Sequence, residues 1–162
     1  MGTFGEVVLR IYCAGPLFSQ AERDFLAGCA QRLREGGFDC FVPHEQEGRV
    51  KPTPESIFAV DFEALRRSDA LFAWLDGPQV DDGTACEIGL FCGLMQEAGS
   101  RRKGIVGLAT DWRVVRRRAF WDHGGINLFL VGAIRRAGRL CWSLDEVVEQ
   151  MIAWRQGSPG AS

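Results

Sequence analysis

The stretch DALFAWLDGPQVDDGTACEIGLFCG, residues 69–93, contains the change of pattern that decides the fold. Its first part, residues 70–75, is an unbroken apolar run with the length of a buried strand. A loop rich in Gly, Pro and Asp follows, after which Gly83 and Thr84 are expected to begin a helix that carries Glu87 in its first turn. Four carboxylates crowd into this loop and helix start: Asp76, Asp81, Asp82 and Glu87. The pattern predicts one strand and one helix of an α/β unit, with an acid-rich site where the strand ends.

The same alternation of strands and helices runs through the rest of the chain. Further strands are predicted at residues 7–13, 38–42, 104–108 and 139–142. Helices are predicted at residues 19–36, 53–67, 84–98, 114–119 and 127–137, and from residue 143 onward. This spacing predicts an α/β doubly wound, mainly parallel five-stranded sheet with helices on both faces, of the Rossmann or flavodoxin type.

Two of these helices carry expectations about packing. The helix at residues 53–67 is expected to turn four apolar side chains inward: Ile57, Phe58, Phe62 and Leu65. Asp61 lies on or beside this apolar face, where an acid either pairs with an arginine at its edge or serves a reaction. Three small residues on the following helix are expected to allow close packing on the sheet: Gly89, Cys92 and Gly93.

Length and composition fit one domain, residues 1–162, with a flexible Gly-, Ser- and Pro-containing tail at residues 156–162. The formal net charge of −2 argues against nucleic acid as a partner, so the arginines at residues 101–118 are expected to form a solvated face rather than a phosphate-binding patch. The six cysteines are spread singly and are expected to be reduced and mostly buried. No segment approaches the ~18 apolar residues of a membrane span, and no signal-peptide pattern opens the sequence. A cytoplasmic protein that does not engage a membrane is therefore expected.

Three predicted loops converge on one edge of the sheet, at residues 14–18, 43–54 and 76–84. An ionised Glu87 in this crevice can attack an electrophilic sugar carbon while a second group protonates the departing piece, as in a retaining glycosidase. Asp61 is the candidate acid, because partial burial raises the pKa of a carboxyl group. Tyr12, the single tyrosine, ends the first strand, and its hydroxyl either orients Glu87 or only packs.

Fewer residues of this sequence match the requirements of other catalytic mechanisms. His44 and His123 are the only histidines, which leaves little choice for a Ser-His-Asp or Cys-His arrangement. Neither a GxxxxGK[ST] loop nor a GxGxxG after the first strand is present. The acids at positions 76, 81, 82 and 87 leave a magnesium site open as an alternative, although their spacing matches no known loop signature.

Several motifs together resemble the nucleoside 2-deoxyribosyltransferase family. The similar pieces are IYCAGPLF at residues 11–18, the pair Asp61 and Asp69, the element Asp81-x-Gly-x-x-x-Glu87-x-Gly89, and INLFLVGAI at residues 126–134. The resemblance implies an enzyme that moves 2-deoxyribose between nucleobases of 2′-deoxynucleosides through a covalent deoxyribosyl–glutamate intermediate. Glu87 matches the nucleophile, Tyr12 the tyrosine that hydrogen-bonds it, and Asp61 the acid that protonates the leaving base. No metal and no cofactor are expected.

The resemblance also implies substrate contacts. Phe18 matches the aromatic ring stacked on the base, and Gln46 a glutamine that contacts the base. Asp81 matches the carboxylate that holds the sugar 5′-hydroxyl, and Gly15 lies in the matching Gly-Pro turn. Asn127 resembles a residue that a neighbouring subunit supplies to the sugar site, which implies a homo-oligomer, either a dimer or a hexamer.

Two alternatives remain open from the sequence. The same fold family includes hydrolases that cleave deoxynucleoside 5′-monophosphates and release the base to water. Asp81, with Asp82 beside it, would repel a 5′-phosphate and therefore favours a free 5′-hydroxyl and the transferase. The other alternative is a non-catalytic nucleotide-binding module. The carboxylate set favours the enzyme, because a sensor needs neither a nucleophile nor an acid.

Overall fold

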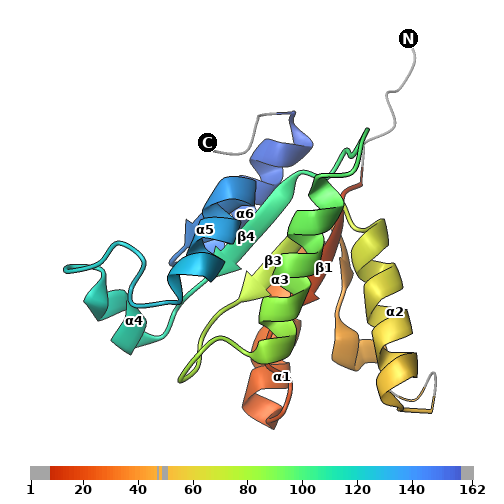
Figure 1. The fold of residues 1–162 in the computed structure, drawn as a ribbon, viewed down its shortest axis with the longest axis horizontal. Helices are drawn as coiled ribbons and strands as arrows, with labels where there is room; N and C mark the ends of the chain where they lie inside the picture. The colour runs from red at the N-terminus through yellow and green to blue at the C-terminus, as the bar shows by residue number, and fades with distance from the viewer. Residues whose placement is uncertain (1–7, 47, 49–50, 158–162) are drawn as a thin grey trace.

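The computed structural model describes residues 8–46, 48 and 51–157, and it confirms the predicted α/β architecture (Figure 1). Its strands are β1 Arg10–Ala14, β2 Asp39–Phe41, β3 Ala70–Trp74, β4 Gly104–Leu108 and β5 Gly138–Cys141. Its helices are α1 Gln20–Glu35, α2 Pro54–Arg67, α3 Asp82–Met95, α4 Trp112–Arg117, α5 Leu128–Ala137 and α6 Leu144–Arg155, with a 3₁₀-helix η1 at Pro43–Gln46. Val7, the predicted start of the first strand, and residues 158–162 of the predicted tail lie outside the described residues.

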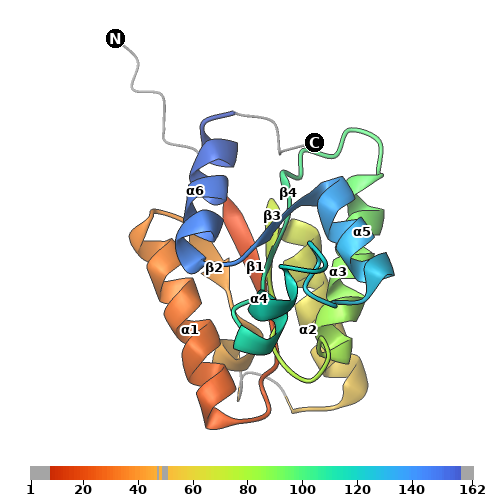
Figure 2. The same cartoon turned by 90° about the vertical axis from the view of Figure 1, so that its left-hand side faces the viewer.

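The sheet consists of five parallel strands in the order β2-β1-β3-β4-β5. Helices α1 and α6 cover one face, and α2, α3 and α5 cover the other (Figure 2). Strand β2 lies on one side of β1, whereas β3, β4 and β5 follow one another on its other side, so the direction of strand addition reverses between β1 and β3. Parallel sheets bind their ligands beyond the carboxyl ends of the strands at such a reversal. The topology therefore places the binding crevice beyond the carboxyl ends of β1 and β3.

Alternate residues of β1 contribute to the two apolar layers of the core. Ile11 and Cys13 pack in the layer that includes α1 and α6, whereas Tyr12 and Ala14 pack in the layer that includes α3 and α5. Strands β3 and β4 are buried along their whole length, as expected for central strands covered by helices on both faces. The pleat of β1 thus directs Tyr12 to the face that carries the acid-bearing helices α2 and α3.

The start of α3 differs from the prediction. The helix begins at Asp82 with Asp81 as its N-cap, two residues before the predicted start, so Glu87 lies in the second turn rather than the first. Asp81 Oδ2 accepts a hydrogen bond from the backbone N–H of Thr84 at 2.9 Å. Aspartate is among the strongest N-cap residues, which explains why the helix starts there.

Two packing predictions for the helices are only partly correct. Gly89 and Gly93 lie on the exposed side of α3, and its sheet-facing side consists of larger apolar residues. On α2, Ile57 and Phe58 are 50% and 57% exposed instead of pointing inward, and Leu65 is the one fully buried side chain of this helix. The N-terminal part of the apolar stripe of α2 therefore borders open space, and its C-terminal part, with Leu65, covers the sheet.

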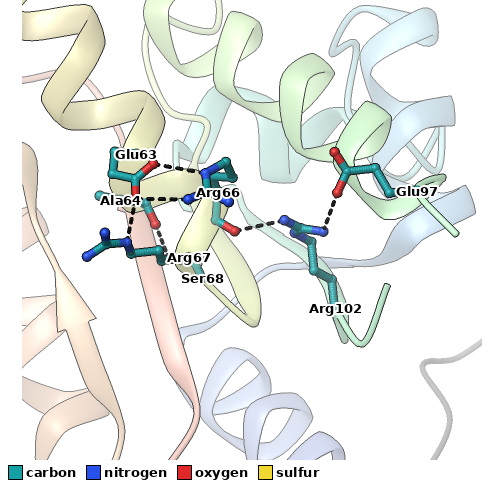
Figure 3. A network of polar contacts seen from close by, with 7 residues as sticks. All are labelled: Glu63, Ala64, Arg66, Arg67, Ser68, Glu97 and Arg102. Carbon is teal, nitrogen blue, oxygen red and sulfur yellow. Dashed lines mark hydrogen bonds and ion pairs between the residues drawn. The ribbon is translucent and has the colours of Figure 1, made fainter. Parts of the chain in front are cut away.

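Arg102 joins the C-terminal ends of α2 and α3, and part of its network is drawn in Figure 3. Its Nη2 donates to the carbonyl of Arg66 at 2.7 Å, and its Nη1 donates to the carbonyl of Leu94 at 3.0 Å and to Glu97 at 3.3 Å. Ser68, which ends α2, is buried and donates its hydroxyl to a carbonyl one turn earlier. The rest of α2, which carries Asp61, thus extends from an anchored C-terminal end.

In the part of the chain that the structure describes, none of the helices is both long and apolar enough to span a membrane.

Candidate active site

The candidate site is centred on a hydrogen bond between Tyr12 and Glu87. Tyr12 Oη donates to Glu87 Oε1, and the two oxygen atoms are 2.5 Å apart. Tyr12 reaches from β1, and Glu87 reaches from the helix that follows the neighbouring strand β3. The parallel pairing of these strands brings together two residues 75 positions apart in the sequence. The structure shows both features predicted for Tyr12, because its hydroxyl contacts Glu87 while its ring packs in the core.

A cleft of about 350 Å³ opens between α2 and α3 beside this pair. Asp61 of α2 and Glu87 of α3 both line it. The rest of its lining is apolar or small: Pro54, Ile57, Phe58, Phe62, Leu65, Gly83, Cys86 and Leu90. The two carboxyl groups that the sequence singles out as nucleophile and acid therefore face the same space.

Burial raises the pKa of both carboxyl groups. Burial has the largest effect on the pKa of Glu87 and raises it. The hydrogen bond from Tyr12 lowers this pKa, whereas the charges of Asp61 and Asp81 raise it further, and the net result is a pKa of about 7. Burial raises the pKa of Asp61 to about 6, as the sequence predicts for an acid beside an apolar face. The dipole of α3 acts mainly within its first turn, and Glu87 lies beyond that turn.

Tyr12 is held as a permanent hydrogen-bond donor. Burial, together with the negative charges of Glu87 and Asp61, raises the pKa of Tyr12 well above its usual range. Its side chain is completely inaccessible to solvent, and its ring stacks on that of Phe41, with ring centroids 5.2 Å apart. Phe41 pairs with Tyr12 in the register of β1 and β2. The phenol is therefore fixed from behind while its hydroxyl faces Glu87.

Asp81 has a structural partner in addition to its predicted role. Its Oδ2 caps α3 through the backbone N–H of Thr84 and also accepts the Thr84 hydroxyl at 3.0 Å. Both bonds are made to the same oxygen, so Oδ1 is the atom through which Asp81 can contact a ligand. The charge of Asp81 reaches Glu87, whose pKa it raises.

The acids that the sequence assigns to no substrate contact stabilise the loop. Asp76 accepts hydrogen bonds from the backbone N–H groups of Thr110 and Asp111, at 2.6 and 2.8 Å, and from the Thr110 hydroxyl. It thereby ties the loop after β3 to the loop after β4. Asp82 accepts the backbone N–H of Gly83. Within the described ranges, no group of three or more His, Cys, Asp or Glu side chains is arranged to hold a metal ion.

The structure does not bring the other predicted contacts into the lining of this cleft within the residues it describes. Phe18 is 83% exposed. Gln46 lies on the opposite side of α2, in a groove against β2, and Asn127 lies beside the loop before Asp81, where its Oδ1 caps α5. Gly15 is buried, and a side chain there would meet Leu26 and Trp74 at 3.3 Å. Close packing therefore accounts for that glycine, and the roles of the other three stay predictions.

Sequence reasoning missed Phe41, Cys86 and the cleft-lining role of Phe58. Cys86 immediately precedes Glu87 and is exposed at the cleft. Phe41 ends the strand beside Tyr12, and Phe58 lies one turn before Asp61. Closeness in the sequence to Glu87 and Asp61 is the signal that points to Cys86 and Phe58, and Phe41 has no such signal. The sequence alone does not say which strands are neighbours or which helix face stays open.

The arrangement provides a candidate nucleophile, a hydroxyl donor that contacts it and a second carboxyl group. A carboxylate held in an apolar cleft can attack an electrophilic carbon, and a carboxyl group with a pKa of about 6 can be protonated near neutral pH and donate to a leaving group. No Lys or Arg occurs among the described residues that line the cleft, so a phosphate group would find no cationic partner there. This chemistry suits a neutral glycoside.

Comparison with known proteins agrees with this chemistry. A family model described as nucleoside 2-deoxyribosyltransferase matches residues 11–151. An uncharacterised protein of Ureaplasma parvum serovar 3 is 30% identical over 138 residues, which cover 78% of this chain and 83% of that protein.

Two solved structures share the fold. A conserved protein from Enterococcus faecalis V583 has a TM-score of 0.75 and 28% identity, with 91% of this chain and 99% of that chain covered. The 2-deoxyribosyltransferase of Bacillus psychrosaccharolyticus has a TM-score of 0.68 and 21% identity, with 94% and 99% covered. Because the family model spans most of the sequence, this chain belongs to the nucleoside 2-deoxyribosyltransferase family.

Proposed function

We propose that this protein transfers 2-deoxyribose from one nucleobase to another through a covalent intermediate on Glu87. The observation that carries the proposal is the hydrogen bond from Tyr12 to Glu87 in a cleft that Asp61 also lines. A carboxylate that needs only to stabilise a fold has no reason to accept a hydrogen bond from a buried phenol in a cleft that a second acid lines. A nucleophile that must be oriented toward one carbon atom has such a reason.

In the first half of the reaction, Glu87 attacks C1′ of the deoxynucleoside. A carboxylate oxygen of Glu87 forms a bond to C1′ while the bond from C1′ to the base nitrogen breaks. The base leaves with the bonding electrons and accepts a proton from Asp61. Tyr12 holds the attacking group in place through its hydrogen bond to Oε1.

The second half reverses these steps with a different base. A nitrogen of the incoming base attacks C1′, the bond between C1′ and Glu87 breaks, and Glu87 returns to the carboxylate form. The proton that the incoming nitrogen loses returns to Asp61, which completes the cycle. Water can replace the base in this step, so slow hydrolysis is expected as a side reaction.

Asp81 favours a substrate whose sugar carries a free 5′-hydroxyl group. Its Oδ1 can accept a hydrogen bond from a hydroxyl, while its charge disfavours a phosphate. The proposal includes Asn127 as a contribution from a second subunit. Asn127 lies outside the Glu87 cleft of its own chain, and its neighbours Leu128 and Phe129 are 69% and 90% exposed. Exposed apolar side chains of this kind are typical of a surface that a partner covers.

The proposal is tested by mixing the protein with thymidine or 2′-deoxyinosine and free adenine. We expect 2′-deoxyadenosine as a product, and we expect a deoxyribosyl group on the peptide that contains Glu87 after rapid quenching. Glu87→Ala is expected to lose both signals while its circular dichroism spectrum stays unchanged. Exchange at the parent rate in this variant would show that Glu87 is not the nucleophile.

The same assay separates the alternatives. Release of free base and sugar without a new nucleoside would indicate a hydrolase, and preference for a 5′-monophosphate would contradict the role of Asp81. Binding of nucleosides without any turnover would indicate a non-catalytic module.

A further inference from the structure

Helix α2 presents an aromatic pair at the cleft that packing of the protein does not explain. The rings of Phe58 and Phe62 stack with their centroids 5.3 Å apart and their planes 8° from parallel. Phe62 is half-buried, whereas Phe58 is 57% exposed beside an exposed Ile57. Both rings line the cleft that contains Glu87. The pair is therefore a flat apolar surface that faces the reaction space instead of the core.

The position of this pair relative to Asp61 relates it to the reaction. Phe58 lies three residues before Asp61, on the same side of the helix, and Phe62 follows it directly. A carboxyl group that protonates a leaving base must lie within hydrogen-bond reach of a base nitrogen. The base must then lie against the part of α2 that carries the two rings. Across the cleft, Gly83 and Cys86 are small residues that leave room for a planar ring system.

We propose that Phe58, supported from behind by Phe62, is the platform on which the departing and incoming nucleobases stack. The inference rests on the proposed function and adds the residue that selects a flat aromatic heterocycle as the acceptor. Stacking of a nucleobase on an aromatic side chain contributes about 1–3 kcal/mol, and it tolerates different bases because each has a π face. The exposed ring of Phe58 meets the requirement for such a contact better than Phe18, which lies outside the cleft lining among the described residues.

The test measures how the covalent intermediate divides between an acceptor base and water. Phe58→Leu keeps the apolar character and the helix propensity of the position but removes the ring. We expect the adenine concentration that gives half-maximal exchange to rise about tenfold, which corresponds to the loss of one stacking contact. Hydrolysis of the intermediate needs no base, so the ratio of new nucleoside to free deoxyribose is expected to fall. This ratio does not depend on how much of the enzyme is folded.

Two further variants complete the experiment. Phe58→Tyr retains an aromatic face and is expected to restore the parent ratio. Phe120→Leu, at a position that is 83% exposed and outside the described cleft lining, removes a matched ring and is expected to leave the ratio unchanged. The loss in Phe58→Leu is expected to be larger with a purine than with a pyrimidine acceptor, because two fused rings overlap more of the phenyl face.

The outcomes separate this inference from the proposed function. An unchanged adenine dependence in Phe58→Leu, with a parent enzyme that exchanges bases, would overturn the platform alone. The same holds if Phe58→Leu changes only the assembly state in size-exclusion chromatography and not the adenine dependence. A parent that forms neither a new nucleoside nor free deoxyribose would overturn the proposed function, and the platform with it.

Discussion

Glu87 lies in a place where burial disfavours the charge that its proposed reaction requires. Burial raises the pKa of both Glu87 and Asp61, so either group can hold a proton near neutral pH. The proposed attack needs that proton on Asp61. The hydrogen bond from Tyr12 favours that arrangement, because it stabilises the ionised form of Glu87. Tyr12 therefore tunes the proton distribution as well as the geometry.

The first prediction concerns the pH dependence of exchange. We expect kcat/KM of the parent to peak between about pH 6 and 7, because both carboxyl groups are protonated below this range and both are ionised above it. Tyr12→Phe removes the hydrogen bond that lowers the pKa of Glu87, so the acidic limb should move to higher pH. The rate at pH 6 should fall at least about tenfold, as expected for a lost hydrogen bond to a charged group. A profile of unchanged shape would contradict this role of Tyr12.

The second prediction concerns stability. The folded pKa of Glu87, about 7, exceeds its ordinary value of 4.5, so between these pH values the unfolded chain releases a proton that the folded chain keeps. The free energy of unfolding therefore falls as pH rises through this window and stays lowered above it. Glu87→Gln removes the titration and keeps an acceptor for Tyr12. We expect it to be more stable than the parent by on the order of 2 kcal/mol at pH 8, and equally stable near pH 4.

Urea denaturation at the two pH values measures this difference. Glu35→Gln, at an exposed position on α1, is the matched control and is expected to show no such pH-dependent gain. A variant Glu87→Gln that is less stable than the parent at pH 8 would show that the folded protein stabilises the ionised carboxylate. The loss of exchange in the same variant would link catalysis to a local cost in stability, as is common at active sites.

At the scale of the elements, α2 acts as a wall of the cleft that is fastened at one end. Its C-terminal end is bonded to α3 through Arg102 and buries Leu65, while residues nearer its N-terminus border the cleft. The distance between Asp61 on α2 and Glu87 on α3 therefore depends on how firmly that end is held. Arg102 is well suited to this task, because its side chain is only 12% exposed and its planar guanidinium donates to two carbonyl groups.

The third prediction follows from this attachment. Arg102→Met keeps the apolar stem and removes the guanidinium, and with it one donor to each of the carbonyls of Arg66 and Leu94. We expect a loss of stability of about 1–3 kcal/mol and a lower kcat, with the largest effect on bases that depend most on protonation by Asp61. Arg101→Met, at the exposed neighbouring position, is the control and should change neither quantity. Lower stability with an unchanged kcat would show that Arg102 does not position the acid.

At the scale of the whole molecule, the open question is whether one chain completes its own site. Asn127 and Glu87 line separate cavities of the chain, and the start of α5 exposes Leu128 and Phe129 to solvent. If a second copy covers this surface, the Asn127 of one subunit can reach the sugar site of the other. The proposed homo-oligomer would then be a condition for activity rather than an addition to it.

The fourth prediction tests this sharing of sites. Glu87→Ala and Asn127→Ser are each expected to be nearly inactive alone, and the serine keeps an oxygen that caps α5. Mixing the two variants, with brief unfolding and refolding to exchange subunits, should restore about a quarter of the parent activity if they form a twofold-symmetric dimer at random. Light scattering on the parent gives the assembly state. Failure to regain activity in a verified mixed oligomer would show that each chain carries a complete site.

The sequence alone led to most of this fold and to the core of the site. The strand predicted at residues 70–75 and the helix predicted from residue 19 both match the structure, because buried strands and helix caps depend on residues close in the chain. Tyr12 and Glu87 could be paired in advance because strands of a parallel sheet end at the same edge. The outward face of α2 could not be predicted, because the same kind of apolar stripe occurs on a helix that covers a core and on a helix that borders a cleft.

What the sequence by itself determined is the alternation of strands and helices and the kinds of side chain at the carboxyl edge of the sheet. Only the tertiary structure decided that the pKa of Glu87 is raised and that Phe41 and Phe58 adjoin the reacting groups. The reason is physical. Local patterns follow from the period of the backbone, whereas burial, electrostatic neighbours and open helix faces depend on segments that meet only after the chain has folded.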